Sequence, residues 1–274
     1  MTTYVLVPGA WLGGWCWQPV TTQLRAHGHD VYPVTLTGLG ERSHLASREV
    51  DLDTYIADVV NLVEFEDLHD VVLVGHSYSG IVVTAIADRI PERIAVLAYL
   101  DSGPVPDGSA YLDLQPPPAK QLIERLAEEV GDGWQIPMPT WEELEGVLGA
   151  SLDGLGDNER SWMRARAVTQ PLRTWTQPVS LKNPAREQLS KLLITCSFPL
   201  AQVRQMTADG HPVGSTIARL HGFTPPHSYL ACATRRVRAL PRIVASTARP
   251  VADLLGGAVR CVPRPFIRPC CSPT

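Results

Sequence analysis

Short hydrophobic runs alternate with helical patterns along most of the chain. Each run is apolar and bounded by Gly, Pro or Asp, a pattern typical of buried strands. The strand candidates are residues 3–7, 31–35, 71–74, 94–100, 192–196 and 237–240. The alternation predicts an α/β fold, a mostly parallel sheet with helices on both faces that binds ligands beyond the carboxyl ends of its strands.

The clearest helical pattern covers about residues 53–66. Its apolar side chains recur at a spacing that places them on one face of a helix. They are Tyr55, Ile56, Val59, Leu62 and Val63. We therefore expect an amphipathic helix packed against the sheet.

The alternation of strands and helices breaks off between residues 104 and 184. Prolines cluster there, and the amphipathic segments between them fall at 120–130, 141–148 and 159–168. We interpret this stretch as a helical lid, residues 104–184, inserted into a core made of residues 1–103 and 185–274. The tryptophans in it favour either the packing of a small helical layer or an apolar acyl or aryl pocket. These tryptophans are Trp134, Trp141, Trp162 and Trp175.

A single serine lies between the strand at 71–74 and a helix rich in small residues. The sequence there is Gly75-His76-Ser77-Tyr78-Ser79-Gly80. A strained strand-to-helix turn exposes its serine as a nucleophile and admits only small residues two positions to either side. Gly75 and Ser79 meet that requirement, although the usual G-x-S-x-G has its second glycine at the fifth position. The alternative is an ordinary glycine-rich turn.

Composition narrows the class of protein. The chain has 274 residues, a net charge of −4 and a pI near 6.1, so it carries no general basic field for nucleic acid. No apolar run is long enough to span a membrane, and the first residues form a strand pattern and not a signal peptide. The six cysteines lack paired spacing, which favours reduced thiols in the cytoplasm over a zinc site. No metal or cofactor is expected.

Four stretches of the chain resemble the α/β-hydrolase family, in the branch that holds plant-type hydroxynitrile lyases, methyl-ester esterases and their bacterial relatives. They are residues 7–17, 28–31, 36–42 and 75–80. The resemblance implies an oxyanion hole formed by the backbone N–H groups of Ala10 and Tyr78. Two such donors stabilise the negative charge of the transition state, each typically worth about a hundredfold or more in rate.

A serine nucleophile needs a base, and the base needs a carboxylate that orients it. In this fold the acid follows either the strand after the nucleophile helix or the next strand. The second position is empty, because residues 195–199 carry no carboxylate and Asp209 lies a helix away. Asp101 fills the first position and resembles the acid of hydrolases that place it there. The alternative is an Asp-Ser-Gly-Pro turn in which the aspartate caps its own backbone.

The histidine that the family places after its last strand is missing. Residues 242–247, which connect the strand candidate at 237–240 to a helix pattern at 249–255, contain none. His211, His221 and His227 are substitutes without a supporting motif. We interpret His76 as a structural residue that points away from the site.

Together these features predict a serine hydrolase that cleaves a carboxylic ester of a small apolar molecule through an acyl-enzyme. One alternative is a hydroxynitrile-lyase-like enzyme, which the lysines of this chain, present only at 120, 182 and 191, do not favour. Another is a catalytically impaired hydrolase fold that binds a small apolar ligand. Neither the substrate nor the oligomeric state follows from the sequence.

Overall fold

The computed structural model describes residues 1–152, 155–195 and 228–232, and its centre is a parallel sheet. Six strands of these residues pair in the order β2-β1-β3-β4-β7-β8, every pair parallel. The strands are β1 (Thr3–Val7), β2 (Asp30–Pro33), β3 (Val71–His76), β4 (Ile94–Leu100), β7 (Ser190–Thr195) and β8 (Ser228–Cys232). The predicted α/β class is confirmed.

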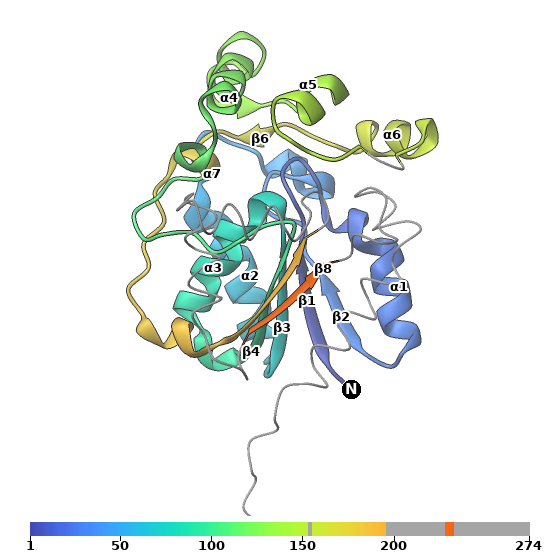
Figure 1. Ribbon diagram of the computed structural model, residues 1–274, viewed down its shortest axis with the longest axis vertical. Helices are drawn as coiled ribbons and strands as arrows, with labels where there is room; N and C mark the ends of the chain where they lie inside the picture. The colour runs from blue at the N-terminus through green and yellow to red at the C-terminus, as the bar shows by residue number, and fades with distance from the viewer. Residues whose placement is uncertain (153–154, 196–227, 233–274) are drawn as a thin grey trace, which may run out of the picture.

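Helices cover both faces of this sheet (Figure 1). Helix α1 (Gln18–Ala26) packs on one face, and α2 (Leu52–Phe65) and α3 (Gly80–Arg89) pack on the other. Alternate side chains of a strand point to opposite faces, so both faces of each central strand are apolar. In β1, Tyr4 and Leu6 join the core cluster under α1, whereas Val5 and Val7 join the cluster under α2 and α3.

Helix α2 begins one residue earlier than its hydrophobic pattern indicates, because a capping box fixes its start. The Asp51 carboxylate accepts a hydrogen bond from the Thr54 amide at 3.0 Å, which satisfies one of the free N–H groups of the first turn. The predicted apolar face is otherwise confirmed, with Tyr55, Ile56 and Val59 fully buried or nearly so.

Most of residues 104–184, called here the inserted segment, lie at the carboxyl ends of the strands, at the top of Figure 1. The last residues of the segment run down beside α3, where the Lys182 and Asn183 amides donate to the Asp88 carboxylate. Prolines at 116–118 precede or open the first helix, where a missing N–H costs nothing. The predicted helices end two to four residues early at 146 and 164. The elements are α4 (Pro117–Glu129), β5 (Gln135–Ile136), α5 (Trp141–Gly146), α6 (Asp157–Arg164), β6 (Gln170–Pro171) and α7 (Arg173–Thr176), with β5 and β6 antiparallel.

Short 3-10 helices form several of the connections. They are η1 (Gly14–Trp17), η2 (Gly40–Leu45), η3 (Ser77–Ser79), η4 (Pro91–Arg93), η5 (Leu112–Leu114) and η6 (Pro184–Gln188). The predicted strand at 31–35 ends at Pro33, since its remaining residues turn toward η1. The strand predicted at 237–240 lies outside the described residues.

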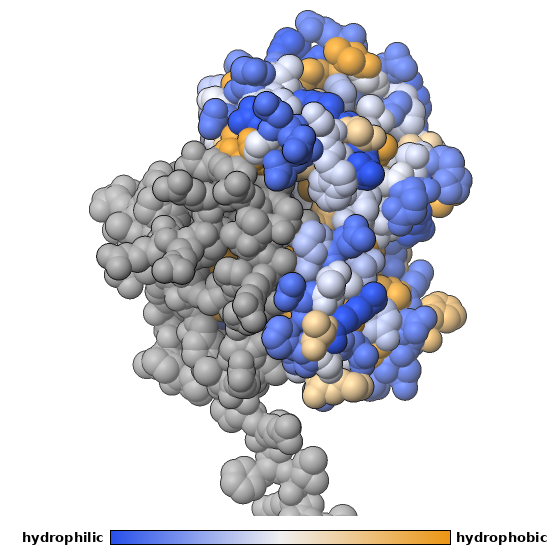
Figure 2. All heavy atoms as spheres, turned by 90° about the vertical axis from the view of Figure 1, so that its right-hand side faces the viewer, coloured by the Kyte–Doolittle hydropathy of each residue, from blue (hydrophilic) through white to orange (hydrophobic). Residues whose placement is uncertain are grey.

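Figure 2 shows the molecule from the right-hand side of Figure 1. On this side the surface of the described residues is mostly hydrophilic, with small separate hydrophobic spots. The large apolar side chains most exposed among the described residues lie on separate elements: Met1 precedes β1, Phe65 ends α2 and Val130 follows α4. Isolated apolar side chains of this kind are normal on a protein surface. No helix in the described part of the chain is both long and apolar enough to cross a membrane.

Candidate active site

Ser77 occupies a sharp turn at the carboxyl end of β3. Its φ of 50° lies in the left-handed region, which non-glycine residues rarely adopt, and its side chain is half-buried between fully buried neighbours. The turn is tight enough to require glycine at position 75. A Cβ added there would lie 2.6 Å from a methyl carbon of Val83 and 2.8 Å from the Ser79 carbonyl oxygen. The strain at Ser77 is therefore enforced by its surroundings.

Ser79 takes the place of the usual glycine without opening the turn. Its side chain is fully buried, and its hydroxyl donates a hydrogen bond to the carbonyl oxygen of Pro8. This bond ties the turn to the loop after β1. Gly80 has no room for a side chain, since a Cβ would lie 2.1 Å from the Ser102 hydroxyl. The second glycine of the usual motif is thus required here at position 80 and not at position 79.

Asp101 lies at the carboxyl end of β4, the strand next to β3. Its φ is 48°, and its amide donates a 2.7 Å hydrogen bond to Ile194 of β7. The following residue contacts the serine turn directly, because the Ser102 hydroxyl donates to the Ser77 carbonyl oxygen at 2.6 Å. The structure thus brings the two predicted catalytic residues to the same edge of the sheet.

The loop after β1 forms the opposite wall of the site. Ala10 is buried and lines the same cavity as Ser77. Gly9 packs against the ring of His76, so closely that a Cβ would lie 2.7 Å from Nδ1. Tyr78, the other predicted oxyanion donor, is buried and donates its hydroxyl to the Thr174 carbonyl oxygen at 2.7 Å.

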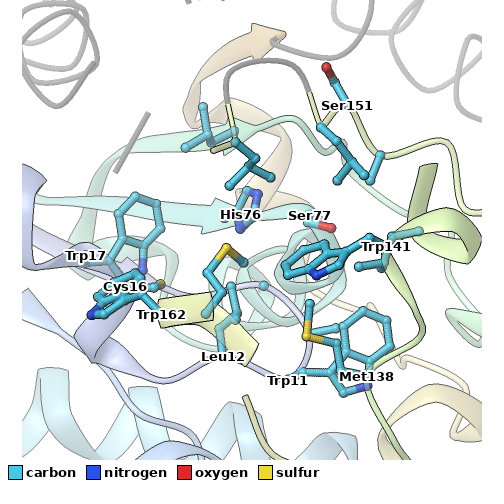
Figure 3. Close-up of a pocket in the computed structure, with 18 residues that line it drawn as sticks. Trp11, Leu12, Cys16, Trp17, His76, Ser77, Met138, Trp141, Ser151 and Trp162 are labelled. Atoms are coloured by element: carbon cyan, nitrogen blue, oxygen red, sulfur yellow. The ribbon is translucent and has the colours of Figure 1, made fainter. Parts of the chain in front are cut away.

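A cavity of about 120 Å³ opens above these residues. Figure 3 shows Ser77 and His76 at its base, with aromatic and sulfur-containing side chains around them. Cavities of about this size hold a single aromatic ring. The side chains from the inserted segment include Met138, Trp141, Leu144, Trp162 and Met163, and those from the loop after β1 and from η1 include Trp11, Leu12, Cys16 and Trp17.

The ring of His76 lines this cavity, so the interpretation that it points away from the site is wrong. The cause is the close approach of Gly9, which leaves space for the ring beside the loop after β1. His76 is 8% exposed, and its Nε2 finds no hydrogen-bond partner among the described residues. Burial lowers the pKa of His76 to about 4, although the negative charge of Asp101 opposes the shift. The imidazole is therefore neutral near pH 7.

This buried neutral imidazole predicts a loss of stability in acid. The unfolded state takes up a proton near pH 6.5, whereas the folded state does so only near pH 4. The free energy of unfolding should therefore fall as the pH is lowered through this window, by roughly 3 kcal/mol in total. Urea unfolding of the parent and of His76→Leu at several pH values measures this term as the difference between the two curves.

The exposed His44 supplies the control, since His44→Gln should give a curve parallel to that of the parent. A His76→Leu curve that also runs parallel to the parent would contradict the assignment.

An aromatic cluster supports the serine turn from the side of the inserted segment. Tyr78 stacks on Trp175 with ring centroids 5.5 Å apart, and Tyr111 packs edge-on against both at 4.9 Å. Burial raises the pKa of Tyr111 to about 12, so this phenol stays protonated and cannot serve as a base near pH 7. The side chains of Gln115 and Ser77 each lower the pKa of the Tyr111 hydroxyl, which places this phenol beside the serine turn.

Several residues of the site were not predicted from the sequence. Tyr111, Trp11 and Trp17 carry no motif that marks them as site residues; only their placement by distant segments does so. Of the tryptophans in the inserted segment, Trp141 and Trp162 line the cavity. Trp175 belongs to the aromatic cluster, and the Arg48 guanidinium packs over the ring of Trp134. The remaining candidates, Asp209, His211, His221, His227 and residues 242–247, lie outside the described residues.

A family model described as "Alpha/beta hydrolase family" matches residues 4–258. The chain belongs to the α/β-hydrolase family. It is similar to the "Carbendazim hydrolyzing esterase" of Nocardioides sp. (strain SG-4G), with 39% identity over 184 residues. The matched stretch covers 66% of this chain and 74% of that relative. Methylesterase 8 of Arabidopsis thaliana is 33% identical over 100 residues, 36% of this chain and 37% of that one. These relatives make the chain a carboxylic ester hydrolase of this family, and the lyase alternative is not favoured.

A solved structure agrees with the fold. An extracellular α/β-hydrolase from a Paenibacillus species superimposes with a TM-score of 0.70 at 21% identity, covering 94% of this chain and 99% of that one. At this identity the likeness supports the architecture and leaves the chemistry to the site itself. The chain spans less than half the length of the plant methylesterase named above.

Proposed function

We propose that Ser77 is the nucleophile of an ester hydrolase, with the Ala10 and Tyr78 amides as its oxyanion hole and Asp101 as the acid that orients the base. The observation that carries the proposal is the strained Ser77 at the base of an apolar cavity, facing the loop after β1. A strained turn at the end of a central strand places a serine hydroxyl in the open, where a carbonyl carbon can approach it.

The reaction follows from these positions. The Ser77 oxygen forms a bond to the ester carbon while its proton passes to the base, and the carbonyl electrons move onto the oxygen held by the two amides. Collapse of this intermediate breaks the bond to the alcohol oxygen, which leaves with the proton from the base. Water then attacks the acyl-enzyme in the same way and releases the acid.

The substrate is an ester of a small apolar molecule, and the cavity favours a flat aromatic group. Trp11, Trp17, Trp141 and Trp162 line it together with two methionines. Rigid aromatic walls stack on planar rings, and thioether sulfurs adapt to their edges. The Nocardioides relative, a carbendazim hydrolysing esterase, supports an ester-cleaving reaction at such a site.

The inserted segment, residues 104–184, acts in this proposal as the lid over a core of residues 1–103 and 185–274. It supplies Met138, Trp141 and Trp162 to the cavity, while Ser77 and Ala10 come from the core. A lid of this kind limits the access of bulk solvent to the cavity and selects the apolar part of the ester.

The mechanism also needs a base that accepts the proton of Ser77. His76 is the histidine that lines the cavity among the described residues, but a group with a pKa of about 4 is a weak proton acceptor near pH 7. His211, His221 and His227 stay the candidates from the sequence, and slow turnover stays a prediction. The impaired, ligand-binding hydrolase fold is not favoured by the relatives. A cytoplasmic location also stays a prediction.

Labelling by a fluorophosphonate probe tests the proposal before any substrate is known. An activated serine attacks the phosphorus and displaces fluoride, so we expect a covalent adduct that mass spectrometry places at Ser77. An aryl methyl ester should slow the labelling at lower concentrations than an aliphatic methyl ester of similar mass, because the cavity is lined by aromatic rings. Absence of labelling, or labelling at another serine, would contradict the proposal.

A further inference from the structure

Trp11, the residue after Ala10, is held in an unfavourable backbone conformation by the inserted segment. Its φ is 65°, in the left-handed region that disfavours a bulky side chain. Three hydrogen bonds tie it to that segment: its amide donates to Gln170 Oε1 at 3.1 Å, its indole donates to the Ile136 carbonyl oxygen at 3.0 Å, and its carbonyl oxygen accepts from the Val168 amide at 3.2 Å.

Gln170 is the one side-chain partner in this set, and its orientation is fixed at both ends. It is 0% exposed, so each polar atom of its amide needs a partner within the protein. Oε1 accepts from Trp11, and Nε2 donates to the Thr174 hydroxyl at 3.0 Å. That hydroxyl in turn donates to the Pro171 carbonyl oxygen at 2.7 Å. Reversing the amide would place donor against donor at Trp11.

The same short stretch of chain holds the other half of the site. The Thr174 carbonyl oxygen accepts the Tyr78 hydroxyl at 2.7 Å, and the neighbouring Trp175 stacks on the Tyr78 ring. Residues 170–175 therefore bind, on one side, the residue next to Ala10 and, on the other, Tyr78. These are the two positions whose amides form the proposed oxyanion hole.

We propose that Gln170 is a positioning residue of the oxyanion hole: its side-chain amide holds the loop after β1, through the Trp11 amide, at the distance from Tyr78 that the oxyanion requires. This inference rests on the proposed roles of Ala10 and Tyr78. It assigns to the inserted segment a part in the chemistry beyond covering the cavity, because the loop keeps its strained conformation only while Gln170 is in place.

The expected consequence is a loss in the chemical step. Without an acceptor for its amide, Trp11 can leave the left-handed region, and the peptide of Ala10 moves with it. A displacement of about 1 Å of a catalytic donor reduces the rate on the order of a hundredfold. Substrate binding should change less than kcat, since Trp17, Trp141 and Trp162 still line the cavity and the oxyanion forms only in the transition state.

Gln170→Met tests the proposal, because methionine has nearly the same shape as glutamine but no acceptor. We expect kcat on an aryl methyl ester to fall by about 10- to 100-fold while KM changes by less than about threefold. The preference for an ester over the matching thionoester should also shrink, since sulfur fits an oxyanion hole poorly and gains little from a correctly placed one.

Gln177→Met is the matched control. Gln177 belongs to the same segment and also accepts hydrogen bonds from core amides, those of Leu52 at 2.8 Å and Asp53 at 3.3 Å. These amides begin α2, and Gln177 does not line the cavity. Its variant should lose docking contacts of the segment but keep kcat within about twofold. Equal losses in both variants would show that general docking, and not the position of Trp11, limits the rate.

Hydrogen–deuterium exchange separates this inference from the proposed function. The peptide that covers residues 9–14 should exchange faster in Gln170→Met than in the parent and unchanged in Gln177→Met, because the Trp11 amide loses its acceptor. If the parent shows no ester hydrolysis but Gln170→Met still exchanges faster than the parent in this peptide, the result would support the role of Gln170 in holding the loop and contradict the proposed function. Unchanged exchange in Gln170→Met would overturn the inference.

Discussion

Ser77→Ala should abolish ester hydrolysis, with kcat/KM reduced by about ten-thousandfold or more if the base is in place. In the proposed mechanism, one hydroxyl forms the acyl-enzyme, and no other side chain of the turn takes its place at the end of β3. The fold should stay intact, because the side chain is half-buried and its loss leaves no cavity of consequence. Initial rates on an aryl methyl ester, together with the melting temperature, measure both expectations.

Ser151→Ala is the matched control for this experiment. Ser151 lines the same cavity from the inserted segment, and its hydroxyl points away from Ser77 (Figure 3), so its variant removes a serine hydroxyl of the lining that does not face the proposed nucleophile. It should keep kcat/KM within a few-fold of the parent, since Ser151 lies outside a strained turn. Turnover by Ser77→Ala equal to that of the parent would remove Ser77 from the mechanism.

The sheet and the serine turn could be predicted from the sequence because their signals are local. A buried parallel strand is a run of apolar residues, as in Ile94–Leu100, where prediction and structure coincide. The turn at Ser77 is likewise encoded by neighbouring residues, since the steric demand falls on Gly75 and Gly80, a few positions away. Element ends were less certain, because caps such as Asp51 start a helix before its apolar face begins.

The surroundings of the serine could not be predicted, because they depend on contacts between distant segments. Trp11 and Gln170 are 159 residues apart, and Tyr78 and Thr174 are 96 apart, yet each pair forms a buried hydrogen bond. Neither pair leaves a periodicity in the sequence. Nothing in the motif around His76 shows that Gly9 leaves space for its ring beside the cavity. Such features become visible only when the segments are packed together.

The acid of the triad had two candidate positions in the sequence, and the geometry favours one of them. Asp101 directly precedes Ser102, whose hydroxyl binds the Ser77 carbonyl oxygen, and its charge acts on the buried His76. A carboxylate at this place lies beside the nucleophile whichever histidine serves as the base. Asp209 lies outside the described residues and has its sequence position alone in its favour.

Asp101→Asn should reduce kcat/KM by about a hundredfold to ten-thousandfold without preventing covalent labelling of Ser77 altogether. The carboxylate fixes the tautomer of the base and stabilises its positive charge, whereas the serine and the two amides stay where they are. Asparagine preserves the volume of the side chain. The turn after β4 should therefore persist, together with the hydrogen bond from the backbone amide of residue 101 to the Ile194 carbonyl oxygen. The rates of ester hydrolysis and of fluorophosphonate labelling should be measured side by side. Slow hydrolysis with retained labelling indicates a misoriented base, whereas loss of both indicates that the site itself is disrupted.

Asp209→Asn decides between the two positions for the acid. If Asp101 orients the base, this variant should hydrolyse esters at a rate within about twofold of the parent, since the side chain of Asp209 then takes no part in the reaction. If instead Asp209→Asn loses activity and Asp101→Asn retains it, the acid follows the later strand, and Asp101 is a turn residue that caps its own backbone. The pair of variants thus tests whether the acid that orients the base is the one that follows β4 or the one that comes after β7 in the chain.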